Sequence, residues 1–565
     1  MGQSTDKSGI ALFIDTAVRC GMRRVVCSPG SRNAPLVIAM DLPPLIDTYV
    51  VHDERSAAFY AMGMAQQSGQ AVGVVCTSGS AMLNYYPAVA EAFYQEIPLI
   101  VMSADRPEEW VNQGDGQTIV QKGVYTNHIR GEMSISEQVE KHEQAVLQEA
   151  IIAHFNLGTQ AWKGPLHFNF PISEPMYTLT EWEHQLDPIE HIDGAAKYTL
   201  DAAFLEAWQR SERRMILCGQ YDPSPALLRL LADLADDSSV AVLVENTSNL
   251  VHPRFVHCID RSLSAISVDE MVNFEPDVLL TLGGAIISKR IKSFLRKSKL
   301  KAHCRVAHSF PEMDTFRALT HLARTTPENF IHVLSQAEGL RNRSLFGSRW
   351  KALDYRMDDL SADYMKQVPY SDLSVFHTLL DFIPNDFTLH MGNSSVVRYC
   401  QLFQPVSSIT YRSNRGTSGI DGSLSTACGA AWLEQDRCHL SIIGDVSFFY
   451  DSNALWSSYL SSGLRIVVIN NGGGGIFRII DGPSSSTQLE KYFEAKPTGK
   501  AEFICQAFDV NYSSAASIPE LEELLPDFFK STLNKRPHLL EIFTPADKND
   551  AVLKHFFNLS SALQE

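Results

Sequence analysis

Residues 439–477 read HLSIIGDVSFFYDSNALWSSYLSSGLRIVVINNGGGGIF. Two short apolar runs, 440–443 and 465–469, flank a segment long enough for a helix. Short runs rich in β-branched residues are typical of central strands in parallel sheets, which are buried on both faces. The stretch therefore predicts a βαβ unit and, with it, an α/β protein built on parallel sheets.

Polar residues directly follow both predicted strands. Gly444 and Asp445 follow the first strand, and Asn470, Asn471 and four glycines follow the second. Ligands of open parallel sheets gather beyond the carboxyl ends of the strands, so these groups are expected at one edge. A carboxylate, an amide oxygen and a backbone carbonyl freed by the glycines suit Mg²⁺, and Mn²⁺ accepts the same oxygen ligands. An ordinary crossover with a glycine-rich turn is the alternative.

The composition is that of a large globular protein. The chain has 565 residues, of which 45% are hydrophobic and 20% charged. At about 150 residues per domain this length exceeds one core, and we expect three domains, at residues 1–185, 190–350 and 365–565. A formal charge of −17 argues against nucleic-acid and anionic-membrane partners and favours small molecules.

The cysteines and the first residues bear on the cellular compartment. Ten cysteines are scattered without CxxC pairs or zinc spacing, which predicts reduced and mostly buried thiols. The opening residues MGQSTDKSGI lack a signal-peptide pattern, and no run approaches the ~18 apolar residues of a membrane span. These features predict a soluble, cytoplasmic protein without membrane insertion.

Residues 1–185 alternate predicted strands and helices, with strands at 24–27, 48–51, 71–76, 99–102 and 166–170 and a helix at 81–95. Polar residues follow the first four strands, at the edge where ligands of parallel sheets collect. A turn formed by Pro29 and Gly30, and a first-turn acid favoured by the helix dipole at Glu54, are the plainer explanations. The candidate ligand residues here are Ser31, Arg32, Glu54, Ser78, Arg106 and Gln117.

The middle region offers fewer candidate groups. After an acidic, aromatic stretch at 181–190, which is expected to be a linker, strands at 215–218, 240–244, 278–282 and 304–308 predict a second parallel sheet. Lys289 and Arg290 follow a glycine turn after the third of these strands and form a pair of cations able to hold a carboxylate. A solvated helix face is the alternative for two adjacent basic residues.

The last third begins with a predicted helix at 371–380 and a strand at 387–391. Polar residues follow that strand, and residues 411–422, YRSNRGTSGIDG, are dense in polar residues and glycine. A small-residue helix at 425–432, the βαβ unit and a strand at 539–543 complete a third α/β domain. The candidates after the strand at 387–391 are Gly392, Asn393, Ser394 and Arg398.

Seven motifs spread over nearly the whole chain carry a family resemblance. They are SPGSRNAPL at 28–36, HDERSAAF at 52–59, TSGSA at 77–81, SADRP at 103–107, SKR at 288–290, NRGTSGIDG at 414–422 and GDVSFFYDSNAL at 444–455. Together with the NN pair at 470–471 they resemble the MenD family, a branch of the thiamine diphosphate (ThDP)-dependent 2-oxo acid decarboxylases. The resemblance implies three doubly wound parallel-sheet domains, which are a pyrimidine-binding, a middle and a diphosphate-binding domain in that order.

The resemblance also implies which residues bind the cofactor. Glu54 is the catalytic carboxylate that bonds the pyrimidine ring, in a water-poor slot that keeps its pKa raised. Asp445, Asn471 and the Gly473 carbonyl hold Mg²⁺, and Ile420 wedges ThDP into a bent form. The implied cofactor set is Glu54, Ser78, Gly392, Asn393, Ser394, Ile420, Gly444, Asp445, Val446, Ser447, Asn471, Gly473, Ile476 and Phe477.

The implied reaction joins two dicarboxylates. In this family 2-oxoglutarate is decarboxylated, and the succinyl-ThDP enamine adds 1,4 to isochorismate, giving 2-succinyl-5-enolpyruvyl-6-hydroxy-3-cyclohexene-1-carboxylate and CO₂ in menaquinone biosynthesis. Several cations should therefore converge on one pocket of an otherwise acidic protein. The implied substrate set is Ser31, Arg32, Arg106, Gln117, Lys289, Arg290, Ser394, Arg398 and Arg415.

Three features depart from the pattern, and two other functions remain open. Val446 stands where glycine is common in the superfamily. Thr417 stands where alanine is common in the family, and NNGGGG at 470–475 stands where NNNGG is common. The resemblance implies a homodimer, or a dimer of dimers, whose active sites lie at the subunit interface. A decarboxylase of smaller 2-oxo acids would need fewer cations, and a degenerate scaffold would not need intact Glu54, Asp445 and Asn471.

Overall fold

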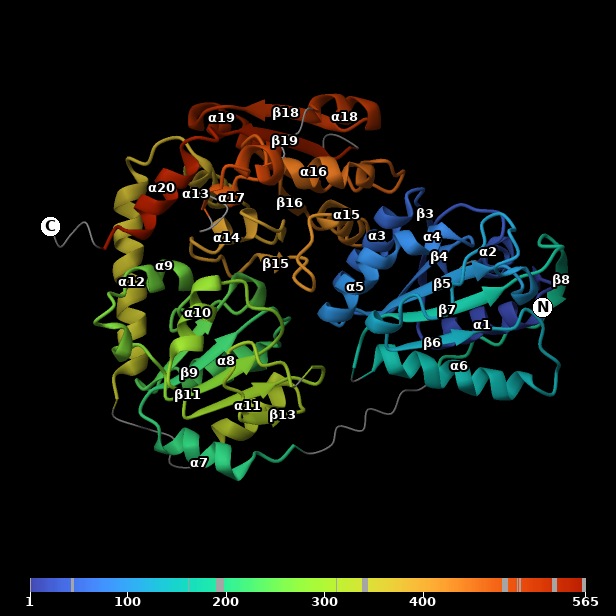
Figure 1. The fold of residues 1–565 in the computed structure, drawn as a ribbon, viewed down its shortest axis with the longest axis horizontal. Coiled ribbons are helices and arrows are strands. Elements are labelled where there is room, and N and C mark those ends of the chain that lie inside the picture. The colour runs from blue at the N-terminus through green and yellow to red at the C-terminus, as the bar shows by residue number, and fades with distance from the viewer. Residues whose placement is uncertain are drawn as a thin grey trace.

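The computed structural model describes residues 2–41, 45–160, 162–189, 198–310, 312–337, 344–479, 486–494, 496, 499–530 and 536–560. Three parallel sheets of six, five and six strands follow one another along the chain, with helices packed around each. Figure 1 shows them as a blue to cyan, a green and an orange to red region. The predicted class, three parallel-sheet α/β domains, is confirmed, whereas the exact domain limits stay a prediction.

The first sheet has the order β3-β2-β4-β5-β7-β6, and all its neighbouring strands are parallel. Its central strands are apolar and wholly buried, as the sequence predicted. The strands are β2 (Arg24–Cys27), β3 (Asp47–Val50), β4 (Val72–Cys76), β5 (Leu99–Asp105), β6 (Gly131–Ser134) and β7 (Leu166–Pro171). The helices are α1 (Ser8–Arg19), α2 (Ala34–Met40), α3 (Glu54–Ser68), α4 (Ser80–Asn84), α5 (Tyr86–Gln95) and α6 (Gln144–Thr159).

Two expectations for this region were wrong. The single helix expected at 81–95 is broken at Tyr85, because Pro87 lacks an N–H and fits only the first turn of a new helix. Part of the linker expected at 181–190 is strand β8 (Leu179–Trp182), which pairs antiparallel with β1 (Gly2–Thr5). Residue 190 lies outside the described residues.

The middle sheet has the order β10-β9-β11-β12-β13 and is also parallel. Its strands are β9 (Arg214–Cys218), β10 (Val240–Val244), β11 (Val278–Leu282), β12 (Ala302–Val306) and the short edge strand β13 (His321–Ala323), which was not predicted. The helices are α7 (Ala202–Arg210), α8 (Pro225–Leu234), α9 (Ile259–Ser264), α10 (Lys289–Lys297), α11 (Pro327–Ser335) and α12 (Phe346–Met365). Helix α12 runs along the middle and third regions (Figure 1).

The third sheet has the order β15-β14-β16-β17-β19-β18. Strands β16 and β17 are parallel neighbours, as the βαβ pattern predicted, but a short helix and the 3-10 turn η5 (Ser452–Leu455) replace one long helix between them. The strands are β14 (Thr388–Met391), β15 (Thr410–Arg412), β16 (His439–Gly444), β17 (Leu464–Asn470), β18 (Asn511–Ala515) and β19 (His538–Phe543). The helices are α13 (Asp372–Phe382), α14 (Val396–Cys400), α15 (Ser423–Leu433), α16 (Asp445–Tyr450), α17 (Ile476–Ile479), α18 (Ala501–Phe508), α19 (Ile518–Phe529) and α20 (Asn549–Phe557).

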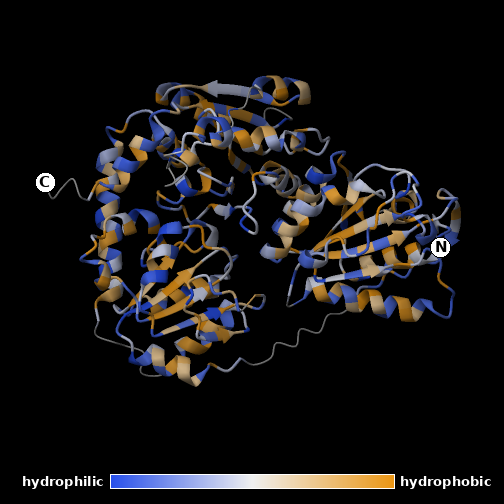
Figure 2. Ribbon diagram, viewed as in Figure 1, coloured by the Kyte–Doolittle hydropathy of each residue, from blue (hydrophilic) through white to orange (hydrophobic). Residues whose placement is uncertain are grey.

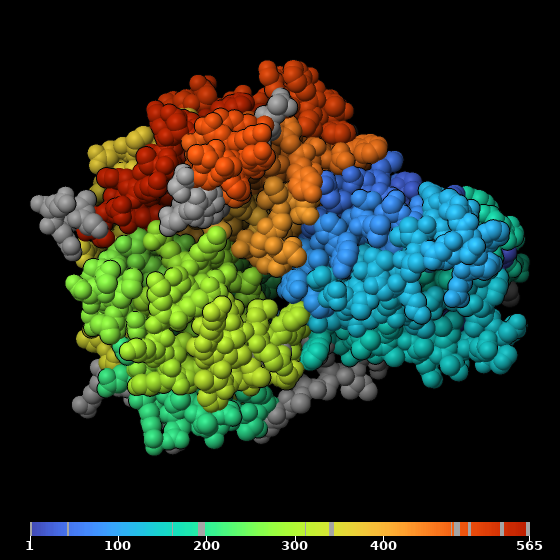
Figure 3. All heavy atoms as spheres, in the orientation of Figure 1, coloured from blue at the N-terminus to red at the C-terminus, as the bar shows by residue number. Residues whose placement is uncertain are grey.

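The first and third regions are joined by the packing of α3 against α15. A Cβ at Gly63 would lie 2.0 Å from the Thr426 carbonyl oxygen, and one at Gly429 would lie 2.0 Å from the Tyr60 carbonyl oxygen. Glycine at both positions therefore lets the two helix backbones touch, and one apolar core continues across the junction. Figure 3 shows the two regions meeting along a broad boundary.

The apolar residues are distributed as expected of a large globular chain. Figure 2 shows several strands inside the sheets in orange, the colour of hydrophobic residues. All ten cysteines are free thiols and nine are buried, as predicted. Within the described part of the chain, every helix is too short or too polar to cross a bilayer.

Candidate active site

The predicted cofactor residues of the third region lie at one sheet edge. Strands β14, β16 and β17 are neighbours, and Gly392, Asp445 and Asn471 each follow one of them directly. The Gly392 N–H donates to the Ile442 carbonyl at 2.8 Å, and a Cβ at Gly392 would lie 2.9 Å from that oxygen. The carboxyl ends of three parallel strands thus bring together residues that lie up to 79 positions apart, Gly392 and Asn471.

Asp445 links the two halves of the βαβ unit. It is 1% exposed and begins α16 directly after Gly444. One carboxylate oxygen accepts from the Val446 N–H at 2.7 Å, and the other accepts from the Gly473 N–H at 2.8 Å. Burial raises the pKa of Asp445 from 3.8 to about 6, although these N–H donors oppose the shift. A nearby cation would stabilise the charged form of this buried carboxylate.

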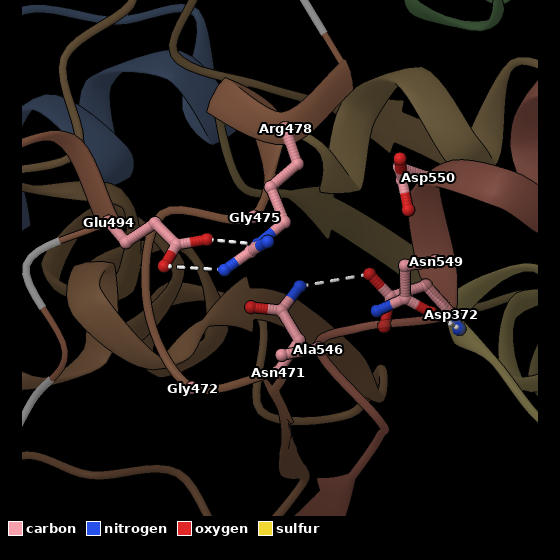
Figure 4. A pocket seen from close by; sticks show the side chains of 9 residues that line it. All are labelled: Asp372, Asn471, Gly472, Gly475, Arg478, Glu494, Ala546, Asn549 and Asp550. Carbon is pink, nitrogen blue, oxygen red and sulfur yellow. Dashed lines mark hydrogen bonds and ion pairs between the residues drawn. The ribbon is translucent and has the colours of Figure 1, made fainter. Parts of the chain in front are cut away.

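Asn471 is oriented by a residue that the sequence analysis missed. Its amide nitrogen donates to Asp372 at 2.9 Å, so its amide oxygen is turned away from that carboxylate (Figure 4). Asp372 begins α13 and also accepts from the Thr544 hydroxyl at 2.6 Å. Burial raises the pKa of Asp372. No local motif marks Asp372, because its partners lie in other elements of the third region.

The glycine run after Asn471 folds against the π-helix η7 (Leu489–Glu494). Gly473 has φ +127°, and a Cβ there would lie 2.4 Å from the Glu494 carbonyl oxygen. The Gly474 N–H donates to that same carbonyl at 2.6 Å, and Arg478 is ion-paired with the Glu494 carboxylate (Figure 4). The Phe477 ring packs on Phe493 at 5.6 Å between centroids, whereas the side chain of Ile476 lies outside the described part.

Asn393 holds the 414–422 loop from inside the third region. Its side-chain nitrogen donates to the carbonyls of Asn414 at 2.7 Å and Gly419 at 2.6 Å. Its side-chain oxygen accepts from Arg415 at 2.6 Å. The Ser447 hydroxyl donates to the Ile420 carbonyl at 3.0 Å, which fixes the same loop to α16. Predicted residues from three segments therefore meet at this edge.

The cations of the third region gather around a second missed carboxylate, Glu245. Arg398, whose Nε donates to the Ser394 carbonyl at 3.2 Å, and Arg415 are both half-buried. Burial lowers the pKa of each arginine. Asp260 and then Glu245 oppose the shift at Arg398, and Glu245 opposes it at Arg415. Lys292 of α10 belongs to the same group of charges. Glu245 directly follows β10, so the strand-end rule could have identified it.

Glu245 also holds the turn that carries the predicted cations of the middle region. It is 1% exposed and accepts from the backbone N–H groups of Ile287 and Ser288, both at 2.7 Å. Lys289 and Arg290 follow this turn and are exposed, and the Arg290 guanidinium stacks 4.2 Å from the centroid of Phe557. Lys289 and Arg290 are therefore the first residues of α10 and lie on the surface, beside the third region.

In the first region, Glu54 begins α3 and is half-buried. Burial raises its pKa, the helix N–H opposes the shift, and Asp53 adds to it. Burial therefore outweighs the helix terminus, as the resemblance required. The hydroxyls of Thr77 and Ser78, after β4, are buried without a hydrogen-bond partner among the described residues. Such unpaired groups mark a place that a polar ligand could satisfy.

The predicted cations of the first region already have protein partners. Arg32 donates to the Ile172 carbonyl at 2.6 Å and pairs with Glu174 at 3.2 Å. Arg106 pairs with Asp115 at 3.2 Å. Ser31 and Gln117 are both exposed, and Gln117, with φ +54°, lies with its backbone over Gly79. These residues share the carboxyl edge of the first sheet with Glu54 and Ser78.

The donor set limits what metal could bind. No group of three or more His, Cys, Asp or Glu side chains is placed to hold a metal ion anywhere in the described ranges. A cation at the third-region edge would be held by the Asp445 carboxylate together with amide and carbonyl oxygens. Hard oxygen ligands of this kind fit Mg²⁺ and not a thiolate or imidazole metal.

The raised pKa of Glu245 predicts a pH-dependent stability. Burial raises it from 4.5 to about 7, so between these values the folded chain keeps a proton that the unfolded chain has released. Stability should therefore fall as pH rises through this window. Glutamine is neutral at every pH, so Glu245→Gln should lose less stability as the pH rises. The Tm of the variant minus the Tm of the wild type should therefore be larger at pH 8 than at pH 5. An equal Tm difference at both pH values would contradict the assignment.

Comparison with known proteins adds a family to this geometry. A family model described as thiamine pyrophosphate enzyme, N-terminal TPP binding domain, matches residues 7–124. Relatives named 2-succinyl-5-enolpyruvyl-6-hydroxy-3-cyclohexene-1-carboxylate synthase occur in Flavobacterium psychrophilum, at 40% identity over 95% of this chain and 96% of that protein. Others are found in Christiangramia forsetii, at 41% over 95% and 96%, and in Porphyromonas gingivalis, at 38% over 99% and 98%.

These matches confirm the resemblance carried by the seven motifs. They cover nearly the whole chain and nearly the whole of each relative. The chain therefore belongs to the 2-succinyl-5-enolpyruvyl-6-hydroxy-3-cyclohexene-1-carboxylate synthase family and is a ThDP-dependent enzyme of the transferase type.

Proposed function

We propose that the chain decarboxylates 2-oxoglutarate and joins the four-carbon fragment to isochorismate, with ThDP and Mg²⁺ bound. The product would be 2-succinyl-5-enolpyruvyl-6-hydroxy-3-cyclohexene-1-carboxylate, the compound in the printed names of the relatives. The observation that carries the proposal is the pair Arg398 and Arg415, half-buried beside the edge that holds Asp445. Two dicarboxylate substrates need such cations, whereas smaller 2-oxo acids do not.

The third-region edge fits a diphosphate and its metal. Asp445 offers a buried carboxylate, Asn471 an amide oxygen turned away from Asp372, and Gly473 a backbone carbonyl. These three would hold Mg²⁺, with Mn²⁺ as an acceptable substitute. At Gly444, just before α16, a Cβ would meet nothing within 4 Å, so phosphate oxygens would have room beside this backbone. Ile420, Ile476 and Phe477 would provide the apolar surroundings.

Glu54 is the proposed acid–base group. Its carboxylate starts a helix, yet burial keeps its pKa above the ordinary value. A carboxyl group in that state can hold a proton at the pyrimidine nitrogen, and the unpaired hydroxyl of Ser78 follows β4 at the same edge of the sheet. When bound, ThDP supplies the electron sink that carbon–carbon cleavage needs. The chain's own task is to orient the cofactor, exclude water and keep this proton in place.

The remaining proposed substrate residues are four cations and three uncharged hydrogen-bonding residues. Arg32 and Arg106 lie at the first edge, and Lys289 and Arg290 lie at the start of α10. The ion pairs of Arg32 with Glu174 and of Arg106 with Asp115 are partly exposed, so exchanging them for substrate carboxylates costs little. Ser31, Gln117 and Ser394 complete the set as hydrogen-bonding groups.

We further propose that the active unit is a homodimer, alone or paired into a dimer of dimers. The residues flanking Glu54 support this, because they contact Tyr450, the last residue of α16, and Asn453 in the turn η5 that follows it, past the end of α16 opposite to Asp445. Asp53 accepts from Asn453 at 2.7 Å, and Arg55 donates to the Tyr450 carbonyl at 2.6 Å. Glu54 and Asp445 of different subunits would then act on one cofactor. The proposed setting is cytoplasmic menaquinone biosynthesis.

One experiment tests the proposed function directly. The purified chain is supplied with ThDP, Mg²⁺, 2-oxoglutarate and isochorismate, and CO₂ and the coupled product are followed by mass spectrometry. We expect both to form, and both to be lost when ThDP is omitted. Release of CO₂ from pyruvate at least as fast as from 2-oxoglutarate, without coupled product, would instead identify a decarboxylase of small 2-oxo acids.

A further inference from the structure

Glu91 is a buried carboxylate that the proposed function does not yet use. It lies in α5 of the first region and is 1% exposed. Its partners are not cations at hydrogen-bond distance but the backbone of a loop in the third region. The Gly416 and Thr417 N–H groups each donate to it at 2.6 Å, and the Ser418 N–H donates at 3.3 Å.

Two side chains add to this contact. The Thr417 hydroxyl donates to the same oxygen of Glu91 as the Thr417 N–H, at 2.6 Å, and Gln95 donates to the other oxygen at 2.5 Å. An alanine at position 417 would lack the hydroxyl and therefore this bond to Glu91. A Cβ at Gly416 would lie 2.5 Å from the Glu91 carbonyl oxygen, which shows how closely the loop approaches α5.

The loop that Glu91 holds carries two proposed site residues. Arg415 directly precedes the bonded N–H groups and is itself bonded to Asn393, and Ile420 follows them. Ser418 has φ +65°, a conformation that residues other than glycine rarely adopt, so the loop needs outside support to keep its shape. Asn393 supplies this support from one side and Glu91 from the other.

We propose that Glu91 is a positioning residue, which fixes the 414–422 loop and thereby places Arg415 for a substrate carboxylate. This inference rests on the proposed function. A carboxylate suits the role because its two oxygens can accept several N–H bonds at once, each strengthened by the charge. On the proposed dimer, the first region of each subunit would serve two sites: Glu54 acts in the partner's site and Glu91 supports the site of its own chain.

The first test measures hydrogen exchange and needs no substrate. Glu91→Gln replaces one acceptor oxygen by an NH₂ group, which cannot accept the loop N–H bonds. Peptides covering 414–422 should exchange faster in this variant, while peptides covering β16 stay as in the wild type. Thr417→Ala removes the hydroxyl bond alone and should cause a smaller change at the same place. Unchanged exchange at 414–422 in both variants would overturn the contact.

The second test measures kinetics in a double-mutant cycle. Glu91→Gln should raise KM for the dicarboxylates by about 10- to 100-fold, since a displaced binding group loses about that much. In an Arg415→Ala background the same change should have little further effect on KM, because Glu91 acts through Arg415. Fully additive effects, or an unchanged KM, would overturn the positioning role.

The two tests separate this inference from the proposed function. If the wild type fails to convert 2-oxoglutarate and isochorismate, the proposed function fails, whereas hydrogen exchange still decides whether Glu91 holds the loop. If Glu91→Gln unfolds the protein, Thr417→Ala takes its place in both tests. For that variant a local increase in exchange with a smaller rise in KM supports the role, and wild-type values for both overturn it.

Discussion

Glu54→Gln is expected to keep ThDP bound while slowing the exchange of the cofactor's C2 proton by about 10²- to 10⁴-fold, the usual contribution of a positioned acid or base. Glutamine has almost the same size and can still accept a hydrogen bond, but it cannot gain or lose the proton. The structure provides the condition for this role, because burial raises the pKa of Glu54 although it begins a helix. Exchange of the C2 proton in deuterated buffer, followed by NMR, measures the effect without the second substrate.

The matched control for Glu54 is another first-turn glutamate. Glu520 lies in the first turn of α19 and is exposed. Glu520→Gln makes the same chemical change at a similar helix position, so it should leave the exchange rate unaltered. C2 exchange at the wild-type rate in Glu54→Gln, with ThDP bound, would exclude Glu54 as the acid–base group.

Asp445→Asn is expected to weaken ThDP binding at least about 100-fold at every Mg²⁺ concentration tried, since losing even an indirect contact to a metal commonly costs 10- to 100-fold in affinity. The side chain is buried and faces the glycine loop through the Gly473 N–H. An amide keeps the shape but loses the charge that a divalent cation needs. Calorimetric titration of ThDP at several Mg²⁺ concentrations measures the effect.

The fold should survive this substitution. Burial raises the pKa of Asp445 to about 6, so at pH 8 the ligand-free protein carries a buried charge that opposes folding. Removing that charge should leave the Tm unchanged or higher at pH 8, even though one N–H bond is lost. Asp451→Asn, at the other end of α16, is the control: it neutralises another buried carboxylate and should not alter ThDP affinity. Wild-type affinity in Asp445→Asn would remove Asp445 from the proposed metal site.

Sequence periodicity predicted the central strands well and the edge strands poorly. Strands β4, β9, β11, β16 and β17 are apolar and buried, and all were predicted within one or two residues. The edge strand β10 is equally apolar and buried, and it was predicted too. The edge or near-edge strands β6, β13 and β18 are short and more polar, and none was predicted. An edge strand has one neighbour only, so its residues need not carry the long apolar run that burial on both faces requires.

The residues of the candidate site also fall into two groups, those that the sequence could identify and those that it could not. The strand-end rule placed Asp445 and Asn471 at one edge, since parallel neighbours end together. The same rule could have identified Glu245, which follows a predicted strand. Asp372 could not be found this way, because nothing near it in the chain shows that it will meet Asn471, 99 residues away.

The sequence by itself determined the parallel α/β architecture, the strand ends that carry the glycines and carboxylates, and the family. These depend on local patterns, namely the spacing of apolar residues and the polar groups that end each strand. Only the tertiary structure decided that Glu91 holds a loop 325 residues further along the chain, and that burial raises the pKa values of Glu54 and Asp445. Such properties arise when segments far apart in the sequence pack together and exclude water, and this packing leaves no periodic trace in the sequence.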